Sequence, residues 1–239
     1  MGVNYRIADL NIQMEVSGWT KRHLEHYGIT SDQQADMVIQ FNSENFQKKH
    51  PHLSLDECEY LASNAAFSHR LIDFNGFTLH ASAIEVDGYA YLFSASSGTG
   101  KSTHTSLWRS VFGSDRVLII NDDKPAIRLV EGIWYAYGTP WSGKTDMQRN
   151  VRVPIAGVCF LEQGSDNEIR RLVGIKAAPH ILNQTVRPKN TESMLRLLEL
   201  TDRLIQQIPI WQLVCTPTEA AARLSFENMV RKEQKHENS

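Results

Sequence analysis

The chain has 239 residues and a mass of 27.2 kDa, enough to bury the core of one domain with a smaller lobe attached. Its formal net charge of -2 and its pI of about 6.5 exclude a general electrostatic attraction to nucleic acid or to anionic membranes. Cys58, Cys159 and Cys215 form no CxxC pair, which predicts reduced thiols. Because residues 1–14 lack the apolar core of a signal peptide and no apolar run reaches membrane-spanning length, we expect a cytoplasmic protein.

The N-terminal third combines short strands with helices. Residues 5–15 and 35–41 have the composition of strands, and a polar segment between them suits a helix. Residues 56–74 carry aromatic and aliphatic side chains at helical spacing, and Asn75-Gly76 breaks this pattern. We expect residues 1–75 to form an N-terminal lobe, which is a candidate for substrate binding.

A predicted hairpin leads into a glycine-rich turn in the middle of the chain. Residues 77–86 and 89–93 are strand-like and flank Asp87-Gly88, a strong hairpin signal. After the turn, residues 101–112 are predicted to form a helix that ends at the next glycine. The apolar, β-branched run at 117–120 suits a buried strand.

Strands dominate the following segment, and helices dominate the end of the chain. A second hairpin is predicted around Glu131-Gly132, and the polar segment 138–150 suits a loop over a site. Residues 191–208 form a predicted amphipathic helix with Met194, Leu195, Leu198, Ile205 and Ile208 on one face. The other predicted elements are strands at 126–130, 133–137, 156–161, 168–173 and 210–215, a last helix beginning at Thr216-Pro217-Thr218-Glu219, and a charged tail at 231–239.

The segment from Phe93 to Thr103, FSASSGTGKST, predicts a phosphate-binding loop. Gly98 and Gly100 allow backbone angles at which successive amides converge on one anion, and a helix beginning near Lys101 directs the positive end of its dipole there. Lys101 would reach the terminal phosphates of a nucleotide, and the Ser102 hydroxyl would bind its Mg²⁺. The usual pattern opens with glycine where this chain has Ala95. The predicted nucleotide contacts are Ser96, Ser97, Gly98, Thr99, Gly100, Lys101, Ser102 and Thr103.

Two adjacent carboxylates follow the predicted strand at 117–120. Asp122 and Asp123 could divide the work of phosphoryl transfer, one holding Mg²⁺ and the other accepting the proton of an attacking hydroxyl. A turn, which Pro125 favours, would let both face the site, and a solvated turn is the alternative. His80, on the predicted strand before the loop strand, could orient a carboxylate or contact phosphate, with a buried core histidine as the alternative.

Three motifs together resemble the catalytic core of HPr kinase/phosphorylase and related serine kinases. They are Leu79-His80-Ala81, the loop SGTGKS at 97–102, and Asn121-Asp122-Asp123. The resemblance covers roughly residues 77–140 and extends more loosely to 172. It implies the phosphoenolpyruvate carboxykinase-like P-loop fold, a mixed α/β fold with a β-rich core. For this chain it predicts a nucleotide-binding catalytic domain at 76–230, with the β-containing lobe before it.

The resemblance implies an active centre made of His80, Lys101, Ser102, Asp122 and Asp123. We favour Asp123 as the base, with Asp122 and Ser102 on Mg²⁺, ATP or another nucleoside triphosphate as the donor, and a serine of a protein or peptide as the acceptor. Family members commonly carry Glu after the loop Lys-Ser, where Thr103-His104 stands here, and their Glu-Ile-Arg-Gly signature, linked to phosphorolysis, is absent. Phosphorolysis is therefore left open, and so is the homo-oligomeric assembly of the family.

The loop Gly138-Thr-Pro-Trp-Ser-Gly-Lys144 resembles that of peptide-tailoring kinases. Lys144, Arg149 and Arg152 could neutralise charge on the transferring phosphoryl group or bind an acidic acceptor, and Trp141 could touch the substrate. Solvated surface cations are the alternative. Two other functions stay open: a kinase for free serine or another small alcohol, and a nucleotide-sensing module without catalysis. We expect neither nucleic acid nor membrane as a partner.

Overall fold

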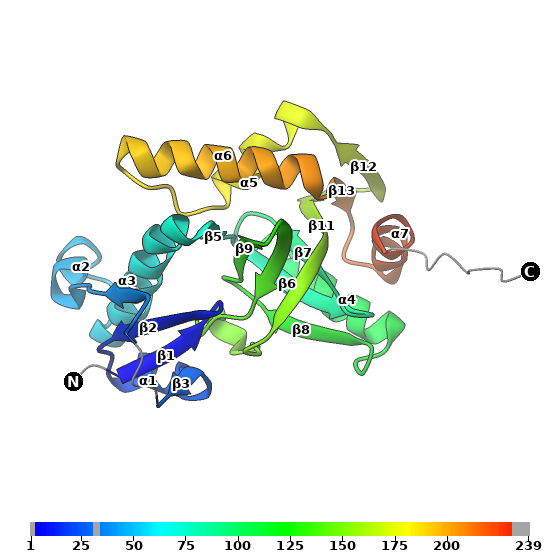
Figure 1. The fold of residues 1–239 in the computed structure, drawn as a ribbon. Helices are drawn as coiled ribbons and strands as arrows, with labels where there is room; N and C mark the ends of the chain where they lie inside the picture. The colour runs from blue at the N-terminus through cyan, green and yellow to red at the C-terminus, as the bar shows by residue number, and fades with distance from the viewer. Residues whose placement is uncertain (1–2, 31–33, 231–239) are drawn as a thin grey trace, which may run out of the picture.

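The computed structural model describes residues 3–30 and 34–230. Within these residues the strands form two β-sheets (Figure 1). A smaller sheet lies in the N-terminal part, and a larger mixed sheet carries the rest of the chain, with helices packed on both of its faces. The predicted mixed α/β class with a β-rich core is confirmed. The charged tail predicted at 231–239 lies outside the described residues.

The smaller sheet has four strands in the described chain. β1 (Val3–Ile7) and β2 (Leu10–Met14) pair antiparallel where we predicted a single strand, which corrects that prediction. Ala8 and Asp9 turn the chain at positive φ angles of 52° and 61°, and a turn without glycine gives little signal in a sequence. The remaining elements are β3 (Gly28–Ile29) beside β1, β4 (Met37–Ile39) parallel to β2, α1 (Gly18–His23), the 3-10 helix η1 (Glu25–Tyr27) and α2 (Ser43–Lys49).

A long helix leads from the smaller sheet to the larger one. α3 (Leu55–Leu71) begins at a capping box in which the Ser54 hydroxyl accepts from the Glu57 amide and the Glu57 carboxylate accepts from the Ser54 amide. After η2 (Ile72–Phe74), Asn75 takes a left-handed φ of 56° and ends the helical run. The predicted helix and its break are thus confirmed.

The larger sheet contains nine strands of the described chain. Seven form the order β5-β9-β10-β11-β7-β6-β8, and β13 pairs with β11 and with β12. Asp87-Gly88 and Glu131-Gly132 take positive φ angles, so both predicted hairpins are confirmed. The strands are β5 (Gly76–Thr78), β6 (Ala81–Val86), β7 (Tyr89–Ser94), β8 (Val117–Asn121), β9 (Ala126–Val130), β10 (Ile133–Tyr137), β11 (Arg152–Gln163), β12 (Glu168–Leu172) and β13 (Ile210–Cys215).

The chain bends at His80, where we predicted one continuous strand. β5 pairs with β9, whereas β6 pairs with β7 and β8. Between them the His80 amide donates to the carbonyl of Gln184 at 2.8 Å, and the Ala81 amide donates to the carbonyl of Asp123 at 3.1 Å. These contacts with distant segments replace a continuous ladder. His80 is therefore a bend residue rather than a strand residue.

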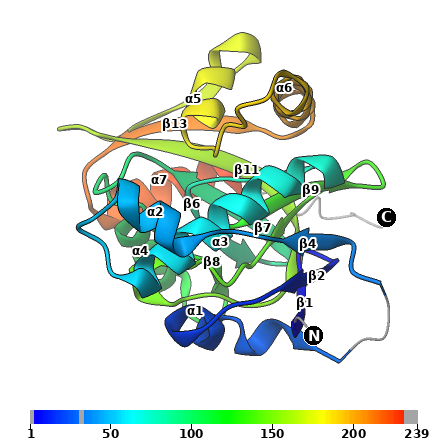
Figure 2. The ribbon, with the colours of Figure 1, turned by 90° about the vertical axis from the view of Figure 1, so that its left-hand side faces the viewer.

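Helices cover opposite faces of the larger sheet, as Figures 1 and 2 show. Alternate residues of β7 divide between two apolar clusters, because successive side chains of a strand point to opposite faces. Leu92 lies in the cluster of α6 (Thr191–Gln207), which follows the short α5 (Ala178–Asn183). Its neighbours Tyr91 and Phe93 lie with α4 (Lys101–Phe112) and α7 (Glu219–Met229), and α4 has the predicted bounds.

Two details of the C-terminal helices differ from the prediction. In α6 the buried leucines are Leu197, Leu200 and Leu204, while Leu195 and Leu198 of the predicted apolar face are 56% and 41% exposed. Leucines occur all round this part of the helix, so packing against the sheet, rather than periodicity, selects the buried face. α7 begins at Glu219 with Thr218 as its N-cap, so the predicted start at Thr216-Pro217 is two residues early.

One apolar cluster joins the N-terminal part with the larger sheet. It contains residues of β1 and β2, Phe67 and Leu71 of α3, Tyr137 at the end of β10, and Trp141 beyond that strand. The division of the chain at residue 75 stays a prediction. Among the described residues, no helix combines the length and apolar character needed to cross a bilayer. Cys58, Cys159 and Cys215 are free thiols, as predicted.

Candidate active site

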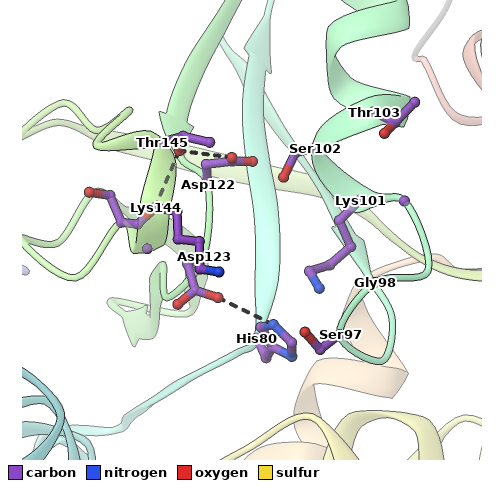
Figure 3. Close-up of a pocket in the computed structure, with 13 residues that line it drawn as sticks. His80, Ser97, Gly98, Lys101, Ser102, Thr103, Asp122, Asp123, Lys144 and Thr145 are labelled. Atoms are coloured by element: carbon purple, nitrogen blue, oxygen red, sulfur yellow. Dashed lines mark hydrogen bonds and ion pairs between the residues drawn. The ribbon is translucent and has the colours of Figure 1, made fainter. Parts of the chain in front are cut away.

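A polar cavity of about 450 Å³ lies between the start of α4, the end of β8 and the segment 142–145 (Figure 3). Its volume is within the range of about 300–1,000 Å³ that is usual for small-ligand sites. The cavity thus unites the motifs that the sequence separates. Its lining consists of His80, Ser97, Gly98, Gly100, Lys101, Ser102, Thr103, Asp122, Asp123, Ser142, Gly143, Lys144 and Thr145.

The glycine loop connects buried β7 with α4. Gly98 and Gly100 have φ angles of 80° and 111°, which a residue with a side chain rarely adopts. The helix begins at Lys101, and its first-turn amides have no partner within a helix, so they are free to face an anion. Among the predicted loop contacts, Ser96 and Thr99 do not line the cavity. The other six predicted loop contacts do.

Lys101 lies inside the loop rather than in solvent. Its side chain is 8% exposed, and its ammonium donates to the carbonyl of Ala95 at 3.2 Å. Burial lowers the pKa of Lys101, and the nearby charge of Asp123 opposes this shift. Ala95, which replaces the usual first glycine, therefore contributes through its backbone carbonyl.

Asp122 is a buried carboxylate held on both oxygens. β8 lies at the end of the sheet order, and all of its residues are buried or half-buried, so the predicted buried strand is confirmed. It delivers Asp122 to the cavity. Oδ1 accepts a hydrogen bond from the Ser82 hydroxyl at 2.6 Å, and Oδ2 accepts one from the Thr145 hydroxyl at 2.9 Å. The carboxylate is thereby fixed in the cavity wall (Figure 3).

The oxygen atoms around Asp122 suit a magnesium ion. Mg²⁺ prefers oxygen ligands and usually binds through one or two carboxylates together with substrate phosphates and water. Asp122 and the Ser102 hydroxyl line the same cavity. The described residues contain no group of three or more His, Cys, Asp or Glu side chains that could hold a metal alone. Asp122 and Ser102 are the cavity residues that could give oxygen ligands to such an ion.

A side-chain turn lets the second carboxylate face the same cavity. The Asn121 side-chain oxygen accepts from the amides of Asp123 and Lys124 at 2.9 and 2.7 Å, and its NH₂ group donates to the carbonyl of Thr139 at 2.8 Å. This Asx turn redirects the chain directly after β8. Neighbouring residues on a continued strand would point in opposite directions, so the turn explains how Asp122 and Asp123 line one cavity.

Asp123 lies between a histidine and a lysine. Its Oδ1 is 3.2 Å from His80 Nε2 and 3.4 Å from Lys124 Nζ. Burial raises the pKa of Asp123, but the hydrogen bond with His80 and the charge of Lys124 outweigh burial, so the pKa lies below its usual value. His80 is held from its other side, since Nδ1 lies 3.0 Å from Gln184 Oε1. Asp123 is thus kept ionised and oriented.

Sequence reasoning missed four residues of this arrangement. Lys124 and Gln184 support Asp123 and His80, and Ser82 and Thr145 hold Asp122. The position of Lys124 beside the aspartate pair was a usable signal. Gln184 had none, because it comes from the segment after α5 and meets His80 only in the folded chain.

The segment 142–148 is held by the N-terminal part of the chain. The Gly143 amide donates to the Tyr60 hydroxyl at 3.1 Å, and His23 Nε2 lies 3.4 Å from Asp146 Oδ1. Tyr27 bonds Gln148 through its hydroxyl. The predicted loop over a site is therefore a structured segment containing η3 (Gly143–Thr145), and it brings Lys144 to the cavity.

Three predicted substrate contacts lie away from the cavity. Trp141 is fully buried, stacks on Phe67 with ring centroids 4.9 Å apart and donates to the Ser63 hydroxyl at 3.2 Å. Arg149 pairs with Glu85 at 2.5 Å, and Arg152 pairs with Asp9 at 3.0 Å. These partners hold the three side chains in structural contacts outside the cavity lining, and their contact with substrate stays a prediction.

The comparisons with known proteins give one family. The family model described as "SynChlorMet cassette protein ScmC" matches residues 62–218. Among solved structures, the HPr(Ser) kinase/phosphatase from Coxiella burnetii is similar with 11% sequence identity and a TM-score of 0.37, over 62% of this chain and 84% of that chain. No curated protein matches the sequence. Because the family match extends over more than half of the chain, including the glycine loop and both aspartates, the chain belongs to the ScmC family of SynChlorMet cassette proteins.

Proposed function

We propose that this protein is a kinase that transfers the γ-phosphoryl group of ATP, or of another nucleoside triphosphate, to a hydroxyl group. The acceptor in this proposal is a serine of a protein or peptide. The observation that carries the proposal is that a glycine loop with a buried lysine and a turn with two carboxylates line one cavity. Phosphate binding and acceptor activation require these two parts in contact.

The phosphates would lie against the glycine loop. The amides at the start of α4 and the positive end of its dipole attract anions, and Lys101 adds a positive charge from a buried position. Most of the rate of phosphoryl transfer comes from positioning and charge neutralisation rather than from covalent chemistry on the protein. Lys144, on the opposite wall, supplies a second cation.

Asp122 and Ser102 would hold Mg²⁺, which when bound neutralises charge on the phosphate oxygens. The hydrogen bonds from Ser82 and Thr145 fix the Asp122 carboxylate before any ligand arrives. This carboxylate therefore has no need to reorient when the nucleotide binds.

Asp123 would accept the proton of the attacking hydroxyl. As the oxygen of the acceptor bonds to the γ-phosphorus, the bond from that phosphorus to the bridging oxygen of the nucleoside diphosphate breaks, and the hydroxyl proton passes to the Asp123 carboxylate. His80 and Lys124 keep this carboxylate charged and aimed. In a loose transition state, orientation of the acceptor matters more than the strength of the base.

A transfer assay tests the proposal. The protein is incubated with Mg²⁺ and γ-labelled ATP, together with either serine peptides or free serine. Asp123→Asn should bind ATP as well as the wild type and lose about 10²- to 10⁴-fold in turnover. Asp166→Asn is the matched control. Asp166 is exposed, accepts a hydrogen bond from the Ser165 hydroxyl and is not in the lining of the cavity.

Each outcome of this assay assigns a function. Labelled peptide supports the proposed acceptor class, and labelled free serine would replace it with a small-molecule kinase. ATP binding without transfer to either would favour the nucleotide-sensing module. Full turnover by Asp123→Asn would remove Asp123 from the role of base.

A further inference from the structure

A second cavity of about 390 Å³ lies on the other side of the glycine loop. It shares Gly98, Gly100 and Thr103 with the first cavity, so the two adjoin across the loop. Figure 3 shows the side chains of Lys101 and Ser102 on the side of Asp122, whereas that of Thr103 points away from it. The loop therefore has one face toward each cavity.

The two cavities differ in charge. The first cavity is lined by four charged residues, Lys101, Asp122, Asp123 and Lys144. Among the described residues, the lining of the second cavity includes no Asp, Glu, Lys or Arg. Its titratable groups are Cys215 and His104, and burial raises the pKa of the Cys215 thiol and lowers the pKa of His104 to about 4. The second cavity is thus uncharged at neutral pH.

The far wall of the second cavity is built from the ends of two parallel strands. β11 and β13 pair up to Gln163 and Cys215, and the chain then leaves each strand in a fixed turn. The Gly164 amide donates to the carbonyl of Cys215 at 3.2 Å, and the Thr216 amide donates to the Asn167 side chain at 2.9 Å. A Cβ at Gly164 would lie 2.3 Å from Val214 Cγ1, so a side chain there would require the Val214 side chain to shift.

We infer that the second cavity binds the nucleoside part of the nucleotide whose phosphates lie on the other face of the loop. This inference rests on the proposed function, since it takes a phosphate chain on the glycine loop as its starting point. A nucleotide is strongly charged at one end and carries an uncharged, planar base at the other, which matches the two cavities. Leu161 and Pro217 offer apolar surface to a base, and Gln163 and Thr216 offer hydrogen-bonding groups.

Comparison of two ligands separates the two halves of the site. Binding of Mg-ATP and of Mg-tripolyphosphate is measured by calorimetry, because tripolyphosphate has the charged end and no nucleoside. Gln163→Trp places a large side chain in the second cavity from an exposed position at the end of β11. It should weaken ATP binding about tenfold or more and leave tripolyphosphate binding within about twofold. Ser165→Trp, which adds the same side chain outside the lining, should change neither.

Photolabelling of the wild-type protein with 8-azido-ATP gives a result that does not depend on a variant. Label recovered in residues 161–164 or 215–217 supports the inference, and label confined to 142–148 would overturn it. Equal losses for ATP and tripolyphosphate in Gln163→Trp, or no loss of ATP binding, would also overturn it. If wild-type protein binds tripolyphosphate but the nucleoside lies elsewhere, the proposed function stands without this inference. If it binds neither ligand, both are wrong.

Discussion

The side chain of His80 and the backbone of the residue after it both contact Asp123. The imidazole Nε2 lies 3.2 Å from Asp123 Oδ1, and the amide of the next residue, Ala81, donates to the carbonyl of Asp123 at 3.1 Å. The bend between β5 and β6 therefore runs directly along the turn after β8. The contact makes His80 a positioning residue for the proposed base.

Replacing His80 should change the pH profile of transfer. Without the hydrogen bond from His80, the pKa of Asp123 should rise. As the pH is lowered, His80→Ala should therefore lose activity at a higher pH than the wild type does. We also expect turnover to fall about tenfold, with ATP affinity retained. His80→Gln should restore part of the turnover. An unchanged acid limb in His80→Ala would show that the contact does not tune Asp123.

Tyr60 of the N-terminal part should help to position the segment Gly143–Thr145, where we expect the acceptor to bind. Tyr60→Phe removes the hydroxyl that accepts from the Gly143 amide but keeps the ring that stacks on Trp19. We expect a loss of about 1 kcal/mol in unfolding free energy. KM for the acceptor should rise while the Kd for ATP stays constant, because Gly143–Thr145 lies on the wall opposite the glycine loop. Tyr135→Phe is the control, and an equal KM change there would contradict this role of Tyr60.

His104 should make stability depend on pH. Burial lowers its pKa to about 4, and its Nε2 accepts from Trp108 Nε1, so the folded protein keeps the ring neutral. The ordinary pKa of histidine is about 6.5, so between about pH 4 and pH 6.5 His104 is protonated in the unfolded chain but neutral in the folded protein. The contribution of His104 to stability is therefore complete above about pH 6.5 and decreases as the pH falls below it. In urea unfolding, the free energy of unfolding should be about 2–3 kcal/mol lower near pH 4.5 than near pH 7 because of His104.

The variant His104→Gln isolates that contribution. Its stability should fall less steeply over the same pH range, because the other titrating groups are unchanged. Parallel curves for the wild type and His104→Gln would mean that His104 does not titrate differently in the two states.

Gly138 should tolerate no side chain. A Cβ there would lie 1.7 Å from the carbonyl oxygen of Arg149 and 2.9 Å from that of Ile120, and backbone atoms cannot move aside as a side chain can. Gly138→Ala should therefore lower the unfolding free energy by at least about 1–3 kcal/mol in chemical denaturation. Gly28→Ala is the matched control, since its Cβ would meet a single atom at 3.5 Å. Equal stabilities of the two variants would contradict the close approach.

Local signals in the sequence determined much of the framework. The glycine loop, the bounds of α4 and both hairpins follow from residues close together in the chain: glycines where φ is positive, and strand-forming residues on either side. The lining of the first cavity by Lys101, Asp122 and Asp123 agrees with the motifs that predicted them. Their chemical roles stay predictions.

Only the tertiary structure decided which side chains meet. Gln184 reaches His80 from the segment after α5, and Trp141 turns into the apolar cluster of the N-terminal part instead of into the cavity. α6 buries Leu197 and Leu200 because the sheet presents its surface on that side, although Leu195 and Leu198 are equally apolar. Periodicity and motifs report on neighbours along the chain, whereas burial and hydrogen bonding between distant segments depend on how the sheets and helices pack.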